Sequence, residues 1–385
     1  MPNARWGVGR LAGVGEVSAV CDRLWPPGWA ESWDNVGLLV GARSAAVGHV
    51  LCALDADQET IGLAASMDAQ MLVTHHPLPF RPLRQVLADD PAGAAILAAA
   101  RHGLAVYSAH TNLDVHPDGV NAALAAALGL SGAIPLRETG RQVLYKLVTF
   151  VPQGAEDTVR EALSHAGAGK LGNYSHCSFS VTGTGTFRPL PGANPFVGEI
   201  GAIERPTEVR FEMLVPEERR AAVVAALLTV HPYEEVAYDL LRLENTGAVR
   251  GLGMVAALPR TQRLGAFAQH VARRLGAPAT RFVGDPDRVV RRVAICGGAG
   301  AELVEDALTA SADALVTADV RYHEARAAEA RGLALVDPGH QATEAPVVPA
   351  MAEALRGALA AARLDVAVSV EPVRKDVWRP TQPRH

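Results

Sequence analysis

Residues 71–80 read MLVTHHPLPF, a short apolar run that ends in two adjacent histidines and a proline. The run is typical of a buried β-strand, and the proline at position 77 favours the end of that strand because it has no backbone N–H. Past the strand end, His75 and His76 can turn toward neighbouring points. They would then serve two metal ions, or one ion and a group beside it; the alternative is a pair of loop histidines, one of them solvated.

Two further stretches share a plan in which an apolar run leads to a histidine and, four residues later, a carboxylate. They are GLAVYSAHTNLD, with His110 and Asp114, and GLALVDPGHQATE, with His340 and Glu344. If a helix starts near Gln341, the last pair lies on one helix face. Imidazole and carboxylate together are ligands of borderline divalent metals. The sequence therefore predicts a metal site assembled from distant parts of the chain.

The regions around these runs alternate between expected strands and helices. Strands are expected over residues 47–55, 70–74, 104–108, 293–296, 314–317 and 333–337. Helices are expected over residues 59–66, 92–101 and 322–331, with a further helix that runs to residue 310. This β-α-β rhythm predicts an α/β fold with mostly parallel sheets and with functional groups at the carboxyl ends of the strands.

The two ends of the chain are also similar in their letters. Aligning the two histidine-carboxylate stretches with one gap sets His110 beside His340 and Asp114 beside Glu344. We interpret the ends as two similar βαβ-type halves of one outer domain. The alternative is that any two β-α-β units look alike.

The middle of the chain has a different character and predicts an inserted α+β domain. Strands are expected over residues 144–151, 177–183, 208–215 and 236–241, and helices over residues 156–166 and 217–230. Two β-α-β units in succession describe a ferredoxin-like split sheet. We therefore expect a discontinuous outer domain over residues 1–135 and 250–385, interrupted by a ferredoxin-like domain over residues 136–249.

Five side chains are the candidate metal ligands: His75, His76, Asp114, His340 and Glu344. Their two negative charges do not balance two divalent ions, so a bridging hydroxide or an anionic substrate is expected as well. Two ions about 3.5–4 Å apart would lower the pKa of a bound water toward about 7. His110 is a possible sixth ligand; we favour a role in holding a carboxylate or water in place, or in transferring a proton.

Other polar groups near these runs have two interpretations each. Asp34 and Asn35 either line a pocket or form a turn. The GGAG loop at residues 297–300 follows a strand in the manner of a phosphate site, but it lacks a Walker lysine and a full dinucleotide fingerprint.

A third polar group follows the strand expected at residues 314–317. Asp319, His323 and Glu324 either contact a substrate or cap a helix at the surface. In the insert, His176 and the HPYEE stretch at residues 231–235 are assigned no metal or catalytic role.

Composition and charge give no support to several classes of protein. The chain has 385 residues and a formal net charge of -5, and it shows no basic cluster with interleaved aromatic residues, so nucleic-acid binding is not indicated. The four cysteines form no C-x-x-C pair and are expected to be free thiols in a reducing compartment. No signal peptide and no membrane-length apolar run is visible, which predicts a cytoplasmic protein.

Taken together, five stretches resemble the dinuclear-metal-centre family named after the yeast NGG-interacting factor three, whose members are also called GTP cyclohydrolase 1 type 2 homologues. They are ESWDNVGLLVG, VTHHPLPF, YSAHTNLDVHPDGVN, ALVTADVRYHEA and LVDPGHQATE. The middle block, with HPYEEVAYDL, is similar to the PII-like or CutA-like insert of the family's longer members. The first 15 residues look like an extension beyond the family's usual start, expected to be disordered.

The resemblance implies a toroidal homohexamer with a two-metal site that faces an internal cavity. Carried over by motif, the metal ligands are the same five residues; the metal is Zn, Fe, Mn, Co or Ni. The function implied is metal-dependent hydrolysis, either the opening of the guanine imidazole ring or a reaction on a related nucleotide-like substrate. The alternative is a non-enzymatic, ring-shaped metal-binding or regulatory scaffold, because fold and ligands do not choose a substrate.

Overall fold

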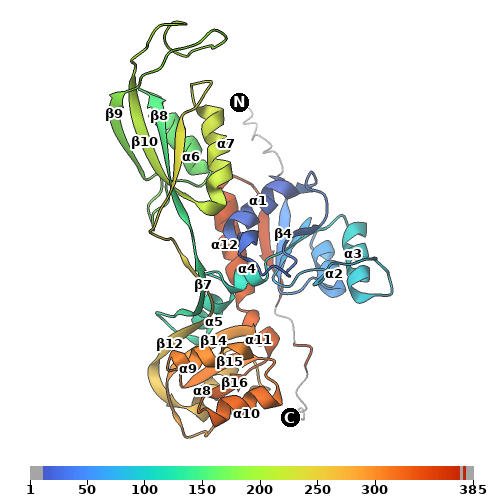
Figure 1. The fold of residues 1–385 in the computed structure, drawn as a ribbon. Coiled ribbons are helices and arrows are strands. Elements are labelled where there is room, and N and C mark those ends of the chain that lie inside the picture. The colour runs from blue at the N-terminus through green and yellow to red at the C-terminus, as the bar shows by residue number, and fades with distance from the viewer. Residues whose placement is uncertain (1–11, 373–375, 379–385) are drawn as a thin grey trace, which may run out of the picture. The chain divides into compact units, whose positions relative to one another are not determined.

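The computed structural model describes residues 12–372 and 376–378 (Figure 1). The chain divides into two compact units. One unit is discontinuous and contains Met1–Thr139 and Arg250–His385, and the other is the insert Gly140–Val249. The larger unit is a mixed α/β structure with mostly parallel sheets, as the sequence predicts.

The first sheet of the larger unit has five strands in the order β17-β4-β5-β6-β2. Their bounds are β17 Ala367–Val370, β4 His49–Ala53, β5 Met71–Thr74, β6 Ala105–Ser108 and β2 Gly37–Val40. The first four strands are parallel to their neighbours, and β2 pairs with β6 in the antiparallel sense. The predicted strands at 70–74 and 104–108 are thus adjacent, and the residues that follow them meet at one edge of the sheet.

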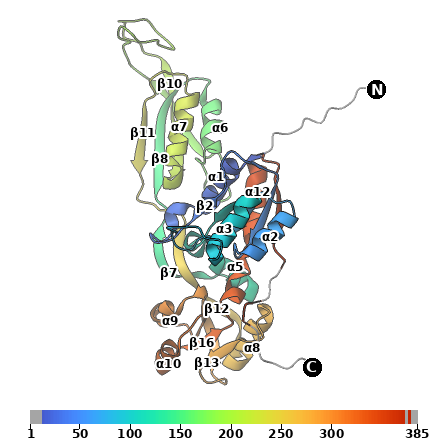
Figure 2. The ribbon, with the colours of Figure 1, turned by 90° about the vertical axis from the view of Figure 1, so that its right-hand side faces the viewer.

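Helices cover both faces of this sheet because its central strands are buried on both sides. Leu51 and Leu72 pack with α2 (Gln58–Ser66) and α3 (Pro91–Arg101), which lie side by side (Figure 2). The residues next to them in these strands point to the other face, and they pack with α1 (Val14–Leu24) and α12 (Val347–Ala361). The predicted helix at 92–101 thus coincides with α3 to within one residue.

The second sheet of the larger unit has six strands in the order β13-β16-β15-β14-β12-β7. Their bounds are β13 Arg281–Val283, β16 Ala334–Asp337, β15 Ala314–Ala318, β14 Val289–Ala299, β12 Val249–Arg263 and β7 Ile134–Arg141. The strands β14, β15 and β16 are parallel, whereas β12 and β13 run antiparallel to their partners. The three parallel strands are those that the sequence predicts in the last part of the chain.

Four helices flank the second sheet. One apolar core contains residues of α5 (Val120–Leu128) and α8 (Leu264–Arg274), and another contains residues of α9 (Val304–Thr309) and α10 (Tyr322–Ala330). Two very short helices, α4 (Thr111–Asp114) and α11 (His340–Glu344), directly follow the loops after β6 and β16. They contain Asp114, His340 and Glu344 of the two histidine-carboxylate pairs, and His110 directly precedes α4 as its N-cap.

The N-terminal stretch contradicts one expectation. Residues 1–11 lie outside the described residues, but Ala12 and Gly13 form β1, which pairs with β3 (Ala46–Val47). Ala12 and Val14 are buried in the first apolar core. The prediction of a disordered extension is therefore wrong for residues 12–15, because burial of these apolar side chains orders the chain there.

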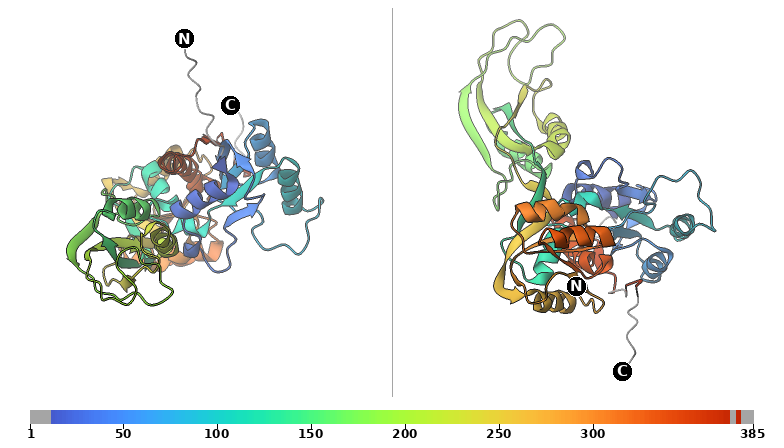
Figure 3. Two further views of the ribbon diagram at one scale, coloured as in Figure 1. Left: turned by 90° about the horizontal axis from the view of Figure 1, so that it is seen from above. Right: turned by 60° about the horizontal axis from the view of Figure 1, so that its bottom comes forward.

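The insert contains one four-stranded antiparallel sheet in the order β11-β8-β10-β9. Its elements are β8 Leu144–Pro152, α6 Glu156–His165, β9 Ser178–Thr184, β10 Thr207–Pro216, α7 Arg220–Val230 and β11 Tyr238–Arg242. The two helices contact each other, and their apolar residues share one core with the sheet. The connection from β9 to β10, residues 185–206, extends beyond the ends of the strands (Figure 3).

Two further expectations from the sequence concern membrane-spanning helices and the cysteines. Among the described residues, no helix is long and apolar enough to cross a membrane. The four cysteines are free, and Cys21, Cys52 and Cys296 are buried while Cys177 is partly exposed.

Candidate metal centre

His75 and His76 are placed by the central strand of the first sheet. They directly follow β5, whose four residues are all buried, and Thr74 donates a hydrogen bond of 2.8 Å from Oγ1 to the carbonyl of His76. The ring of His75 is fully buried, and its Nδ1 lies 3.0 Å from the carbonyl oxygen of Ala109. A carbonyl only accepts hydrogen bonds, so Nδ1 carries the proton and Nε2 keeps its lone pair. That lone pair is what a metal ligand needs.

Three other histidines are held in the same way, each through Nδ1 by a carboxylate. The pairs are His76 with Asp55 at 2.7 Å, His110 with Asp34 at 2.9 Å, and His340 with Asp319 at 2.7 Å. Such partners orient a ligating imidazole and leave Nε2 for the ion. Four histidines with oriented rings and available Nε2 atoms are the pattern of a metal centre.

The carboxylate Glu344 comes from the opposite sheet. It ends α11, the short helix that begins at His340 after β16, so both side chains project from one helix face. The backbone of Gly298, at the end of β14, lies against them. A Cβ at Gly298 would stand 2.3 Å from Oε1 of Glu344, and its φ of +61° is in the left-handed region. Glycine is required here for both reasons.

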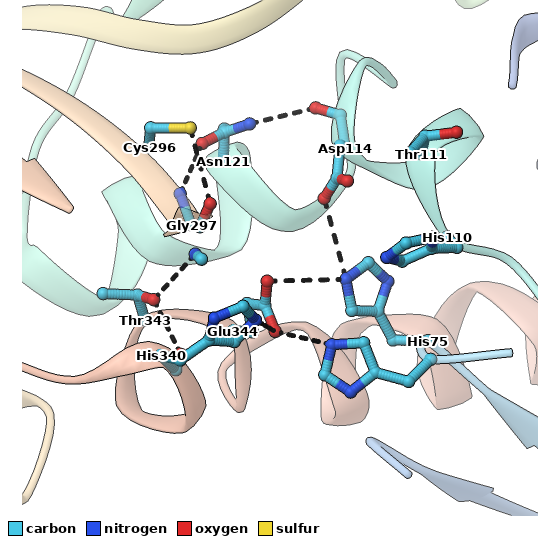
Figure 4. Close-up of polar contacts among 12 residues, drawn as sticks. His75, His110, Thr111, Asp114, Asn121, Cys296, Gly297, His340, Thr343 and Glu344 are labelled. Carbon is cyan, nitrogen blue, oxygen red and sulfur yellow. Dashed lines mark hydrogen bonds and ion pairs between the residues drawn. The ribbon is translucent and has the colours of Figure 1, made fainter. Parts of the chain in front are cut away.

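Glu344 stands between the histidines of the two sheets (Figure 4). Its Oε2 lies 3.0 Å from Nε2 of His76 and 3.0 Å from Nε2 of His340. Its Oε1 lies 3.8 Å from Nε2 of His75, and Oδ1 of Asp114 lies 3.7 Å from that same nitrogen. The five side chains predicted from the sequence thus meet at one point.

The donor set fits a metal ion. Nε2 of His75 is buried without a hydrogen-bond partner among the described residues. Buried polar atoms without partners are rare in folded proteins, and ligand atoms that converge without hydrogen-bond alignment are typical of an ion site. Two overlapping groups have all their ligand atoms within 4.8 Å of one another: His75, His76 and His110, and His76, His340 and Glu344.

Mutual charge interactions shift the protonation of these groups. Burial opposes the charge on Glu344, but contacts with the histidines outweigh it and hold the pKa of the carboxyl well below its usual value. Burial lowers the pKa of His76, but its contacts with Asp55 and Glu344 outweigh this and raise the pKa to about 10. The carboxylate of Glu344 raises the pKa of His340 to about 9. In the protein without metal, protons therefore balance the buried carboxylate.

Two other polar groups have a role that neither of their alternatives named, and a third takes one of its two expected roles. Asp34 accepts hydrogen bonds from Thr111 as well as from His110, so it supports the centre. Asp319 supports it too, through His340, and has a left-handed backbone with φ of +54°. Glu324, in contrast, accepts from the backbone N–H of Arg321 and caps α10.

The GGAG loop is not a phosphate site. Its backbone N–H groups already donate to side chains of the protein: Gly297 to Asn121, Gly298 to Thr343 and Gly300 to Thr317. These glycines instead allow the close approach of β14 to the centre.

Sequence reasoning missed Asp55. The signal was present, because Asp55 is the second residue after the apolar strand β4 just as His76 is the second residue after β5. It stood inside the predicted strand 47–55, however, and a single aspartate after a strand has no distinctive partner until the sheet brings His76 beside it.

The sequence as a whole matches one family of proteins. The family model described as Duf34/NIF3 (NGG1p interacting factor 3) matches residues 12–376. The chain belongs to this family. The resemblance seen in the five sequence stretches is thereby confirmed, and the match begins at Ala12, where the described structure begins.

Relatives of this family member are similar along nearly all of their length. A protein of Halalkalibacterium halodurans named GTP cyclohydrolase 1 type 2 homolog is 43% identical over 331 residues, which are 86% of this chain and 89% of that protein. One of Mycobacterium leprae with the same name is 40% identical over 371 residues, 95% of each chain. A crystal structure of a Bacillus cereus protein related to NIF3 is 38% identical with a TM-score of 0.83, and the match covers 97% of this chain and 100% of that one.

Proposed function

We propose that this protein holds two divalent metal ions and acts as a metal-dependent hydrolase on a nucleotide-like substrate. The observation that carries the proposal is the position of Glu344, whose two oxygens face different histidines. One ion would be held by His75, Asp114 and Oε1 of Glu344. The other would be held by His76, His340 and the carboxylate of Glu344.

The side chains and backbone around the ions would hold the metal ligands in position. When bound, the two ions supply Lewis acidity and lower the pKa of water toward neutrality. Ala109, Asp55 and Asp319 hold the histidine rings in position from outside, so little reorganisation is needed for chemistry. The two ligand carboxylates do not by themselves balance two divalent ions, and the carboxylates of Asp34, Asp55 and Asp319, which hold the histidine rings, would supply the remaining negative charge. His110, oriented by Asp34, is placed to hold a water or transfer a proton.

Two exposed aromatic rings beside His110 support a substrate with a flat ring. Trp33 is 57% exposed and Phe80 is 47% exposed. Their ring centroids lie 6.3 Å and 5.7 Å from that of His110. Exposed aromatic faces stack on planar bases with little cost in conformational entropy. The relatives' name points in the same direction, to hydrolytic opening of the guanine imidazole ring with release of formate.

The assembly and the insert complete the proposal. We infer a ring-shaped homohexamer, on the family resemblance, and a ferredoxin-like (PII-like or CutA-like) insert over residues 136–249. The insert's strand order β11-β8-β10-β9 and its two helices support the ferredoxin-like assignment of the insert. Size-exclusion chromatography with light scattering tests the hexamer, and limited proteolysis tests the independence of the insert.

Metal content per subunit is the first test of the function. Plasma mass spectrometry on protein purified without chelators should find about two ions per chain, and the loaded protein should release formate from GTP or hydrolyse a phosphoester. Two ions without turnover of any nucleotide would replace the hydrolase with a metal-binding scaffold. If no metal binds tightly, even after reconstitution, both the hydrolase and the metal-binding scaffold are wrong.

A further inference from the structure

The inserted unit contains a cavity of about 380 Å³. This volume is in the range of small-molecule sites. Its walls come from the 185–206 connection, from β10 and from the residues after the HPYEE histidine. Aromatic rings form much of the lining: Phe150, Phe187, Phe196 and Tyr233.

The HPYEE stretch builds one wall of this cavity. His231 is buried, with its Nε2 3.1 Å from the carbonyl oxygen of Phe150 and its Nδ1 3.1 Å from the backbone nitrogen of Tyr233. The carbonyl only accepts and the backbone N–H only donates, so the neutral tautomer with hydrogen on Nε2 satisfies both. Burial also lowers the pKa of His231. Both ring nitrogens are thus used in positioning Tyr233, and neither is left for a metal.

Contacts with this wall fix the connection that closes the cavity. The ring of Tyr233 lies 6.4 Å from that of Phe187 and 5.9 Å from that of Phe196, centroid to centroid. The carboxylate of Glu234 accepts a hydrogen bond of 2.8 Å from the backbone N–H of Asn194. These contacts hold the Pro/Gly-rich 185–206 connection over the opening of the cavity.

A buried carboxylate without a cationic partner faces this space. Glu208 on β10 is only 9% exposed, and its Oε1 accepts a hydrogen bond of 2.9 Å from the hydroxyl of Tyr233. Burial and the Glu208 carboxylate raise the pKa of Tyr233 to about 12, which keeps that hydroxyl a donor. No described side chain donates to Oε2 of Glu208 or forms an ion pair with this residue. The second carboxylate oxygen is therefore available to a hydrogen-bond donor on a ligand.

The charges of the lining select a cation. Three carboxylates, of Glu208, Glu234 and Glu235, stand against the one guanidinium of Arg188. A bare metal ion fits poorly, because among the described residues ligand atoms converge in threes only at the candidate metal centre. A positive group that also presents apolar surface fits both the aromatic rings and the carboxylate.

We propose that the cavity of the insert binds a small organic cation, an ammonium group on an apolar or aromatic stem, with the N–H donating to Oε2 of Glu208 and the stem lying among the aromatic rings. The ligand would be a primary amine rather than a nucleotide. This site is separate from the hydrolase proposal and does not depend on it.

Isothermal titration of the full chain with 2-phenylethylammonium and its neutral analogue 2-phenylethanol tests the proposal. The cation should bind at least about tenfold tighter than the alcohol, which corresponds to about 1.4 kcal/mol. Glu208→Gln keeps an acceptor for Tyr233 but removes the charge, so it should abolish the tenfold preference. Glu161→Gln, an exposed carboxylate on α6 outside the cavity, is the matched control and should keep it.

A second variant protects the test against a folding defect in Glu208→Gln. Phe196 is 63% exposed, so Phe196→Leu should fold normally and weaken cation binding several-fold through loss of the ring face. Equal affinity for cation and alcohol would overturn the proposal, as would no binding of the cation up to about 10 mM. A preference that persists in folded Glu208→Gln would also overturn it. So would binding of Mg²⁺ or Zn²⁺ that competes with the amine and depends on Glu208.

Discussion

Oε2 of Glu344 lies 3.0 Å from Nε2 of His76, although the two residues belong to opposite ends of the sequence and to different sheets of the larger unit. The same oxygen also meets His340, four residues back along its own helix. One carboxylate therefore joins the ligands of the first sheet to those of the second. Neither half of the larger unit holds the whole site by itself.

Removing the charge of Glu344 should empty the centre. Because both of its oxygens face histidines, we expect Glu344→Gln to lose both metal ions, whereas Asp114→Asn should lose mainly the ion at His75. Both variants should remain folded by circular dichroism. Metal content by plasma mass spectrometry measures the effect, and Glu353→Gln, an exposed carboxylate on α12, is the control. A full metal complement in either variant would show that the ligand assignment is wrong.

Asp55 should support the metal without touching it. It holds Nδ1 of His76 at 2.7 Å, and removal of such a partner typically weakens metal binding by about 10- to 100-fold. We expect Asp55→Ala to lose metal to a competing chelator at a correspondingly lower chelator concentration. Asp57→Ala is not a suitable control, because Asp57 caps α2. Asp89→Ala, in the exposed loop before α3, serves instead. Identical chelator curves for Asp55→Ala and the wild type would contradict the role.

Metal binding should release protons near neutral pH. The pKa values of about 10 for His76 and about 9 for His340 mean that both imidazoles are protonated at pH 7 in the metal-free protein. Ligands must lose their protons to bind, so affinity rises as pH increases from 7 toward 9 and falls as the medium is acidified. Calorimetric titration with Mn²⁺ in two buffers of different ionisation enthalpy counts the protons. The same heat in both buffers would show that no proton leaves.

Gly298 should be intolerant of any side chain. In Gly298→Ala the new Cβ would stand 2.3 Å from Oε1 of Glu344, and the left-handed backbone adds strain. Gly332→Ala is a matched control, because Gly332 has φ of +80° but nothing within 4 Å of its Cβ position. The control should lose about 1 kcal/mol from backbone strain alone. Gly298→Ala should lose more in chemical denaturation and should also bind less metal; equal losses would show that the centre tolerates the displacement.

The sequence by itself determined much of the parallel framework and its polar ends. Apolar runs of four or five residues such as MLVT and AVYS have one stable place, between neighbouring strands under helices, so β5 and β6 were predicted within one residue. Pro77 after β5 and Pro338 after β16 mark where those two strands end. The histidines and carboxylates that follow were therefore recognisable as candidate ligands from local pattern alone.

Elements whose sequence shows no clear pattern of apolar and polar residues were not predicted. The helix α5, VNAALAAAL, is nearly all apolar and shows no clear face, and β12 is a 15-residue strand whose length depends on its partner β14. Their burial is decided by what packs against them. The ordered start at Ala12 follows from the same cause, since only the core shows that this residue is covered.

Only the tertiary structure decided how the ligands are shared and supported. That Asp55 holds His76, that Gly298 makes room for Glu344, and that Glu344 faces two sets of histidines depend on contacts between residues far apart in the chain. The physical reason is range: strand and turn propensities act over a few residues, whereas a ligand's geometry, protonation and charge are set by neighbours that only the packing of two sheets brings together.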